Sequence, residues 1–224
     1  FIIIIQLQLG IVYFFAGVAK LNYDWLFEAM PLRMWLPPHT HLPIIGFLMD
    51  KLWVAYFFSW FGAIYDLSIP FLLVYKKTRA FAYFLVIAFH VMTSLLFNIG
   101  MFPYIMILCT LVFFSEEFHM GIINRFRKKT ASLVPERQFE FKPVLKNVLL
   151  IFCVIHFTIQ LLMPFRYVLY PGKLFWNEEG FRFSWRVMLM EKAGKVFFHV
   201  TDPDTGRHGE AMMDNVLTPF QEKM

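Results

Sequence analysis

Three ionisable side chains lie in or at the end of long apolar runs of this sequence, where a charge is costly to bury. Lys20 ends the first run, Asp66 lies within a later one, and His90 lies within the next. Ionisable groups at membrane depth are rare and are functional candidates by default. A lysine amine that loses its hydration is more easily kept uncharged, and it can then act as a base. The structural alternative for Lys20 is an amine that reaches the interface and marks the membrane edge.

Asp66 and His90 are expected at similar depths in two neighbouring runs. Asp66 comes nine residues before Tyr75, the end of its run, and His90 comes ten residues after Ala80, the start of the next. At about 1.5 Å per residue both lie roughly 13–15 Å deep, so the sequence predicts that they pair across antiparallel helices. Such a pair either fixes helix packing or takes part in chemistry. We expect the packing role, because Lys20 should lie closer to the outer surface.

The composition is that of an integral membrane protein. Of 224 residues, 58% are hydrophobic and 17% are charged, and the mean hydropathy is +0.56. Soluble domains average roughly 45–50% apolar and about 25% charged residues. The balance excludes a disordered chain, a coiled coil and, despite a net charge of +5, a nucleic-acid-binding module. Cys109 and Cys153 lie in apolar runs, so we expect no disulfide framework, and the His and Cys spacing suggests no metal site.

Five apolar runs must supply the helices that position these groups. A spanning helix needs about 20 mostly apolar residues, with a range of about 17–25, and all but the fourth run meet that requirement. The fourth run is short, and on length alone it is either re-entrant or buried. The sequence therefore predicts a mainly α, polytopic helical membrane bundle with about five passes. The runs are Phe1–Ala19, Leu52–Tyr75, Ala80–Phe97, Met101–Phe114 and Val144–Met163.

Two basic links orient the predicted bundle. Residues 76–79 carry three Lys or Arg residues, and Ser115–Pro143 carries six. Both links are predicted to be cytoplasmic by the positive-inside rule. The stretch between them, Ala80–Phe114, must then cross an even number of times, either as two passes or as one re-entrant hairpin. This arrangement predicts that the tail, Pro164–Met224, lies outside the cytoplasm.

The predicted domain boundary lies at the end of the last run. Residues 1–163 form the transmembrane helical domain, and because the sequence starts inside an apolar run we expect this domain to be N-terminally truncated. Residues 164–224 begin an extracytoplasmic, β-containing domain. There, Lys195–Asp202 and Arg207–Met212 flank a Pro-Asp-Thr-Gly turn and predict a β-hairpin. The aromatic segment Phe181–Met190 fits either a strand or an interfacial segment.

Four blocks of the sequence carry a family resemblance. In chain order they resemble the vitamin K-dependent γ-glutamyl carboxylase family, whose bacterial relatives are called HTTM-domain proteins. Together they extend over nearly the whole chain, and it is their order that makes the resemblance specific. The blocks are Ile11–Trp25, Asp66–Ser68 with Phe71–Leu73, Phe89–Met92 through Phe97–Tyr104, and Phe183–Arg186.

The resemblance implies a reaction and its partners. In that family an uncharged lysine at the position of Lys20 deprotonates reduced vitamin K. Oxygenation of the hydroquinone to its epoxide then supplies a base that removes a γ-proton from a protein glutamate, and CO2 adds to that carbon. The implied cofactor is reduced vitamin K or menaquinol, with O2 and CO2 as co-substrates and a glutamate-containing protein or peptide as partner. An apolar, Phe-rich pocket at the membrane face suits this chemistry because it excludes water.

Further site residues follow from the same resemblance. Arg33 matches a basic position after the lysine motif and is expected to hold a substrate carboxylate. Its structural alternative is an exposed interfacial arginine. Trp185, Met188 and Phe183 belong to the segment expected to line the glutamate and quinone pocket, although a tryptophan at this depth also suits the interfacial belt.

The sequence departs from the vertebrate-like pattern in several places. Phe181 and Phe183 stand where that pattern has tyrosines, Met190 stands for a histidine, and Ala19 stands for the lysine that precedes the catalytic one. These departures resemble bacterial-type relatives. They favour a bacterial inner membrane over the endoplasmic reticulum, with the active site on the extracytoplasmic face.

A second function class is a non-catalytic membrane scaffold, or a lipid- or quinone-binding protein, that keeps the helical fold. Lys20 separates the two classes. An enzyme loses quinol epoxidation on Lys20→Ala with the fold intact, whereas a scaffold tolerates the change.

Overall fold

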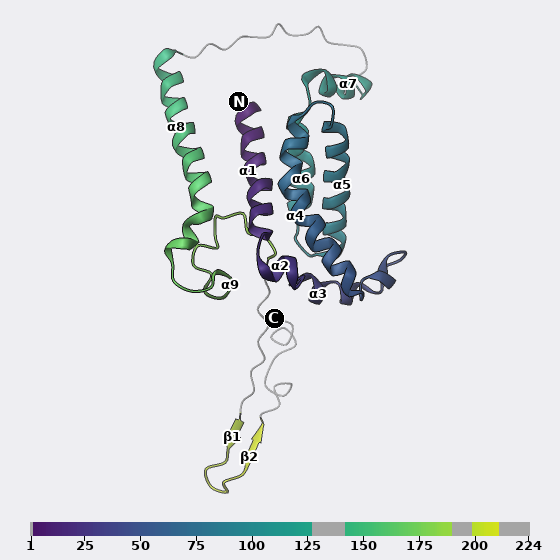
Figure 1. Ribbon diagram of the computed structural model, residues 1–224, viewed down its shortest axis with the longest axis vertical. Coiled ribbons are helices and arrows are strands. Elements are labelled where there is room, and N and C mark those ends of the chain that lie inside the picture. The colour runs from purple at the N-terminus through teal and green to yellow at the C-terminus, as the bar shows by residue number, and fades with distance from the viewer. Residues whose placement is uncertain (1, 127–141, 190–198, 211–224) are drawn as a thin grey trace. The chain divides into compact units, whose positions relative to one another are not determined.

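The computed structural model describes residues 2–126, 142–189 and 199–210 (Figure 1). The chain forms two compact units, Phe1–Met190 and Glu191–Met224, which are treated separately below. The four basic residues of segment 127–141 that contribute to the predicted cytoplasmic link lie outside the described residues, as does Met190.

Four of the predicted apolar runs form helices long and apolar enough to cross a membrane. They are α1 (Ile2–Lys20), α4 (Leu52–Val74), α5 (Arg79–Leu96) and α8 (Pro143–Leu162), which continues as the 3-10 segment η4 (Met163–Leu169). Each is built from consecutive apolar residues, so its backbone hydrogen bonds are satisfied internally, as a bilayer requires. The prediction of a mainly α, polytopic membrane fold is therefore confirmed.

The short fifth run forms helix α6 (Phe102–Thr110) followed by the 3-10 turn η3 (Leu111–Phe113). The chain then bends by 114° into α7 (Glu116–Phe126). At about 1.5 Å per residue α6 and η3 are shorter than the roughly 30 Å hydrocarbon layer. The bundle thus has four full-length spans, or five if this bent pair is counted as one.

The helices alternate in direction, so that residues 76–79, helix α7 and the start of α8 lie at one end of the bundle. In Figure 1, α1, α5 and α8 run toward the end that carries α2 and α3, whereas α4 and α6 run back toward α7. Lys76, in the first link, lies close enough to Glu117 of α7 to interact with it electrostatically. The chain direction agrees with the predicted even number of passes between the links. The side of the membrane on which they lie stays a prediction.

Helices α1 and α4 pack unusually closely because a glycine lies between them. A Cβ atom at Gly17 would lie 2.7 Å from Leu67 Cγ and 2.8 Å from the Leu67 backbone nitrogen, which is too close for any other residue. Small residues of this kind let helix backbones approach one another in membrane proteins. About two turns earlier in α1, Gly10 has looser packing, with a Cβ position 3.8 Å from Pro70 Cβ.

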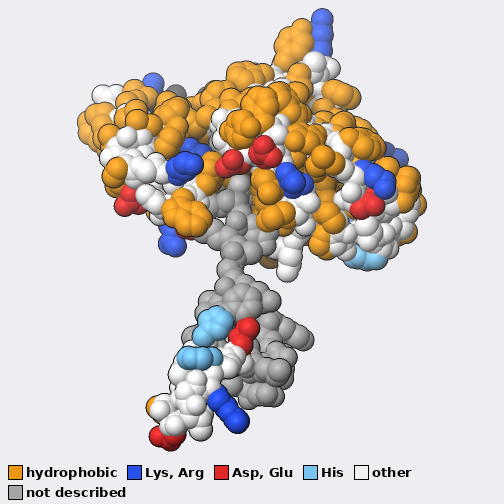
Figure 2. Space-filling view, turned by 60° about the horizontal axis from the view of Figure 1, so that its bottom comes forward, with side chains coloured by type: hydrophobic (Ala, Val, Ile, Leu, Met, Phe, Trp, Pro, Cys, Tyr) orange, Lys and Arg blue, Asp and Glu red, His pale blue; other side chains and the backbone are white. Residues whose placement is uncertain are grey.

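Helix α8 contrasts with α1, α4 and α5 because none of its side chains is buried. It contacts α1 through a hydrogen bond of 2.9 Å between His156 Nε2 and Gln8 Oε1, and its continuation η4 contacts α1 through the rings of Phe165 and Phe15, 5.7 Å apart. Hydrophobic side chains cover much of the face of the helical unit seen in Figure 2. Such a surface suits contact with lipid rather than with water.

The segment between α1 and α4 closes one end of the bundle. It contains α2 (Tyr23–Phe27), α3 (Leu32–Trp35) and two 3-10 turns, η1 (Pro37–His39) and η2 (Gly46–Leu48). Asn22 caps α2 by accepting a hydrogen bond of 2.9 Å from the Trp25 backbone amide.

Trp25 fastens this segment to α4. Its indole Nε1 donates to the Ser59 carbonyl over 2.8 Å, and the Ser59 hydroxyl donates to the Trp25 carbonyl. These two bonds satisfy polar groups that would otherwise be buried without partners.

The aromatic segment 181–189 folds as turns, which contradicts the strand alternative for the described residues. It follows the short helix α9 (Leu174–Asn177). Phe183, Trp185 and Met188 have positive φ angles of 58°, 57° and 52°. Each such non-glycine conformation costs of order 1–3 kcal/mol, and such strain clusters at ligand sites. The Ser184 hydroxyl steadies the turn by donating to the Gly180 carbonyl over 2.7 Å.

The second unit contains the predicted hairpin. Strands β1 (His199–Thr201) and β2 (His208–Glu210) pair antiparallel, with Val200 opposite Gly209. Asp202 holds the turn by accepting hydrogen bonds from the Thr205 hydroxyl and the backbone amide of residue 204, which lower the pKa of its carboxyl. The predicted extensions at 195–198 and 211–212 lie outside the described residues.

Candidate functional site

Lys20 and Asp66 form a buried pair where α1 meets α4. Lys20 Nζ lies 2.6 Å from Asp66 Oδ2 and also contacts the Ala16 carbonyl at 3.3 Å. The two side chains are only 11% and 6% exposed. The amine is therefore held away from water, beside a carboxyl group.

This contact corrects the prediction that Asp66 pairs with His90 while Lys20 stays nearer the surface. The reason is the close packing at Gly17, which brings α1 against α4. Lys20 lies three residues after Gly17 and so projects from the same helix face. A depth estimate along single helices could not include this approach.

The surroundings of Lys20 suit an amine in a confined, aromatic site. Its Nζ lies 5.4 Å from the centre of the Trp25 ring, and an ammonium over an aromatic face is stabilised by the ring's quadrupole. Both side chains pack against α4 at Gly62, where a Cβ atom would be in ordinary contact, 3.9 Å from Lys20 Cε and from Trp25 Cζ2. Lys20 and Trp25 therefore share one contact site on α4.

His90 bonds to a hydroxyl chain instead of to Asp66. Its Nε2 lies 3.2 Å from the Tyr13 hydroxyl, which lies 3.2 Å from Thr110 Oγ1. The Thr110 hydroxyl in turn donates to the Met106 carbonyl over 2.7 Å. The chain links α5, α1 and α6, so it fixes the orientation of the imidazole.

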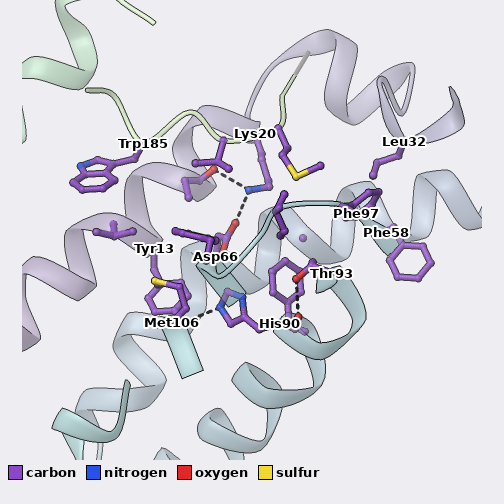
Figure 3. A pocket seen from close by; sticks show the side chains of 18 of the residues that line it. Tyr13, Lys20, Leu32, Phe58, Asp66, His90, Thr93, Phe97, Met106 and Trp185 are labelled. Atoms are coloured by element: carbon purple, nitrogen blue, oxygen red, sulfur yellow. Dashed lines mark hydrogen bonds and ion pairs between the residues drawn. The ribbon is translucent and has the colours of Figure 1, made fainter. Parts of the chain in front are cut away.

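Lys20, Asp66 and His90 all line one cavity of about 120 Å³ (Figure 3). The rest of its wall is mostly apolar and aromatic. A concave apolar site with a few convergent polar groups is the usual form of a small-molecule site. A flat aromatic ligand with polar oxygens fits this lining, because rings can stack while the oxygens meet the polar groups. Aromatic side chains of the wall include Trp25, Trp35, Phe58, Phe89, Phe97 and Phe102.

The turn segment 181–189 contributes Trp185 and Met188 to the cavity wall. Trp185 Nε1 is buried and has no hydrogen-bond partner within the part of the chain that the structure describes. A buried donor without a partner is costly, so a ligand oxygen there would relieve the cost.

The residue after Trp185, Arg186, stacks its guanidinium 4.8 Å from the centre of the Tyr167 ring, and burial lowers the pKa of Arg186.

Two predicted site residues lie outside this cavity. Arg33 is exposed and forms an ion pair of 3.4 Å with Glu28. On the short helix α3 its neighbours Leu32 and Trp35 face the cavity, which leaves Arg33 on the opposite side. Phe183 is 79% exposed and does not line this cavity, although it belongs to the same turn segment as Trp185 and Met188.

Sequence reasoning missed Tyr13 and Thr110 as partners of His90. Tyr13 was part of the first family block, but nothing distinguished its hydroxyl from those of the other tyrosines. Thr110 lies near the end of the short apolar run, where nothing in the sequence indicates that its hydroxyl is a hydrogen-bond partner of another helix. Within the described residues, no group of three or more His, Cys, Asp or Glu side chains is arranged to hold a metal.

Comparison with known proteins identifies the family of this chain. Residues 1–118 match the HTTM domain, and residues 145–224 match the domain described as "Vitamin K-dependent gamma-carboxylase, lumenal domain". No solved structure gives a significant match. The first match covers more than half of the 224 residues, and it includes Lys20, Asp66 and His90. The chain belongs to the vitamin K-dependent γ-carboxylase family of HTTM-domain membrane proteins.

Proposed function

We propose that this protein couples the oxygenation of reduced vitamin K to the addition of CO2 at the γ-carbon of a protein glutamate. The observation that carries the proposal is the buried Lys20–Asp66 pair, 2.6 Å apart, at the wall of an aromatic cavity. A scaffold has no need to bury an amine and a carboxyl group there, since replacing both with apolar residues often stabilises a protein.

The residues of the cavity suit a hydroquinone ring. Trp25, Phe58 and Phe89 offer aromatic faces, while Trp185 Nε1 is a buried donor without a partner among the described residues. When bound, reduced vitamin K, or menaquinol, supplies through its reaction with O2 a base stronger than any side chain. Deprotonation of a glutamate γ-carbon near neutral pH needs such a base.

Lys20 is the proposed proton acceptor. Its Nζ takes a proton from a hydroxyl group of the bound hydroquinone, and the ammonium that forms lies 2.6 Å from Asp66 Oδ2. For this step Lys20 must begin as a neutral amine. Asp66 makes that state accessible, because a buried pair can hold one proton on the carboxyl group and so avoid separating two charges in an apolar site. After the step the pair holds one proton more than at the start, and release of that proton to solvent restores the neutral amine beside the protonated carboxyl group.

The cavity wall also protects the chemistry from water. Phe102 lies against His90, with ring centres 6.3 Å apart, whereas Phe97 packs against Trp35, with ring centres 5.7 Å apart, and both pairs belong to the cavity wall. Exclusion of water prevents quenching of a strong base before it meets its substrate. The proposal places the glutamate of a protein or peptide substrate beside Trp185 and Met188, at the extracytoplasmic face of a bacterial inner membrane.

The test uses the full-length parent protein in detergent, with reduced vitamin K, O2, labelled bicarbonate and a glutamate-containing peptide. We expect Lys20→Ala to lower both epoxide formation and CO2 incorporation by at least about 100-fold, the contribution typical of a positioned general base. Lys51→Ala is the matched control, because that lysine is exposed and pairs with its neighbour Asp50.

Each outcome of this test bears on the proposal. Lys20-dependent epoxide without fixed CO2 would retain the quinol chemistry and reject this glutamate substrate. Equal activity of wild type and Lys20→Ala would reject Lys20 as the base. No activity of either kind in folded wild-type protein would favour the scaffold or quinone-binding function.

A further inference from the structure

The hydrogen bonds around His90 determine which of its ring nitrogens carries a proton. The Thr110 hydroxyl donates to the Met106 carbonyl, which cannot donate. A hydroxyl has a single hydrogen, so Thr110 Oγ1 accepts the bond from Tyr13. The Tyr13 hydrogen is then used, and Tyr13 Oη must accept from His90 Nε2. His90 therefore carries its proton on Nε2.

The opposite ring nitrogen of His90 is consequently an acceptor. His90 is only 4% exposed and lies among apolar and aromatic side chains, and burial disfavours an imidazolium. In the neutral ring with Nε2–H, Nδ1 carries a lone pair and no hydrogen. His90 lines the cavity together with Lys20 and Asp66, so a ligand there can contact the imidazole, and Nδ1 is the ring nitrogen that Tyr13 does not use.

We propose that His90 Nδ1 makes the cavity selective for the reduced form of an aromatic quinone. A hydroquinone hydroxyl can donate a hydrogen bond to Nδ1. A quinone carbonyl can only accept one, so its oxygen lone pair and the Nδ1 lone pair would repel each other. The ligand class rests on the function proposed above, but the tautomer rests only on the hydrogen bonds. One such hydrogen bond corresponds to about a tenfold difference in affinity.

The decisive variant is Thr110→Val, which keeps the side-chain shape and removes the hydroxyl. Tyr13 then has no acceptor at Thr110 and can donate to His90 Nε2, so the ring proton moves to Nδ1. An Nδ1–H group favours the quinone carbonyl instead of the hydroxyl. Thr158→Val is the matched control, because Thr158 makes the same bond to a carbonyl four residues earlier, over 2.8 Å, on the exposed helix α8.

Two measurements test the proposal on the full-length protein. Anaerobic equilibrium dialysis with labelled menadiol and menadione gives the ratio of their dissociation constants. We expect wild type and Thr158→Val to favour menadiol by about tenfold, and Thr110→Val to lose or invert that preference. Nitrogen NMR of the histidine rings, with His90 assigned by comparison with His90→Gln, should show the proton on Nε2 in wild type and on Nδ1 in Thr110→Val.

The proposal is overturned by wild-type His90 that carries a proton on Nδ1, or by equal affinity ratios in wild type and Thr110→Val. If Thr110→Val does not fold, Tyr13→Phe is the alternative variant, because it removes the hydroxyl that holds the ring proton on Nε2. The NMR measurement on the wild-type protein needs no variant. Neither measurement requires O2, CO2 or turnover. A failure of epoxidation with the affinity ratio intact would therefore reject the proposed function and leave the role of His90 standing.

Discussion

At the scale of single residues, the site depends on two polar groups that stabilise each other in apolar surroundings. Lys20 and Asp66 are each expensive to bury alone, and their contact at 2.6 Å offsets much of that cost. Removal of one partner leaves the other without compensation. Removal of both leaves an apolar contact between α1 and α4, which the neighbouring side chains can fill.

This asymmetry gives a stability prediction. Asp66→Leu should destabilise the protein by about 3–5 kcal/mol, whereas the double variant Lys20→Met/Asp66→Leu should recover most of that loss. Thermal unfolding in detergent measures the order of the melting temperatures. A double variant with a melting temperature below that of Asp66→Leu would contradict this prediction. It would show that the two side chains stabilise the protein by more than the interaction between their charges.

At the scale of elements, the separation of α1 and α4 sets the distance between the amine and the carboxyl group. Gly17 allows the two helices to approach this closely. Lys20, one turn later on the same face of α1, therefore reaches Asp66 of α4. Gly10 lies on the same side of α1 but has ordinary space, with Pro70 Cβ 3.8 Å from its Cβ position. The two glycines therefore form a matched pair for substitution.

We expect Gly17→Ala to destabilise the bundle by about 1–3 kcal/mol, because the new methyl group meets the Leu67 backbone. It should also lower quinol epoxidation, since α1 must move away from Asp66. Gly10→Ala should be neutral or stabilising by up to about 1 kcal/mol, because alanine favours the helix. Melting temperatures and epoxide assays of both variants check this, and equal losses would contradict the role given to Gly17.

At the scale of the whole molecule, the proposed reaction requires a defined orientation in the membrane. The basic link at residues 76–79 is predicted to face the cytoplasm, and the tail that carries the hairpin is predicted to face the opposite side. Helix direction agrees with both links lying at one end of the bundle (Figure 1).

Cysteine labelling tests this orientation. In a background with Cys109→Ala and Cys153→Ala, we expect Thr205→Cys to react with an impermeant maleimide added outside intact cells. Lys77→Cys should react only after the membrane is opened, because an ionic reagent cannot cross the bilayer. Labelling of both positions in intact cells would contradict the predicted topology, and lysed cells provide the control for accessibility.

Much of the fold was predictable because its signals are local. Each long apolar run became a helix within a residue or two of its predicted ends, as α4 illustrates, since a bilayer leaves the backbone few alternatives. The hairpin at β1 and β2 was predictable for a similar reason, because its turn residues and alternating pattern lie within a dozen positions. Segment 181–189 was not, since its positive φ angles follow from packing rather than from residue preference.

The sequence by itself determined the membrane class, the helices and the identity of Lys20 as the candidate base. Only the tertiary structure decided the partners: Lys20 with Asp66, His90 with Tyr13, and Arg33 on the outside. A partner depends on which helices are neighbours, how closely they approach and how each is rotated. Those quantities arise from contacts such as Gly17 against Leu67, which are made between residues distant in the chain and leave no local pattern.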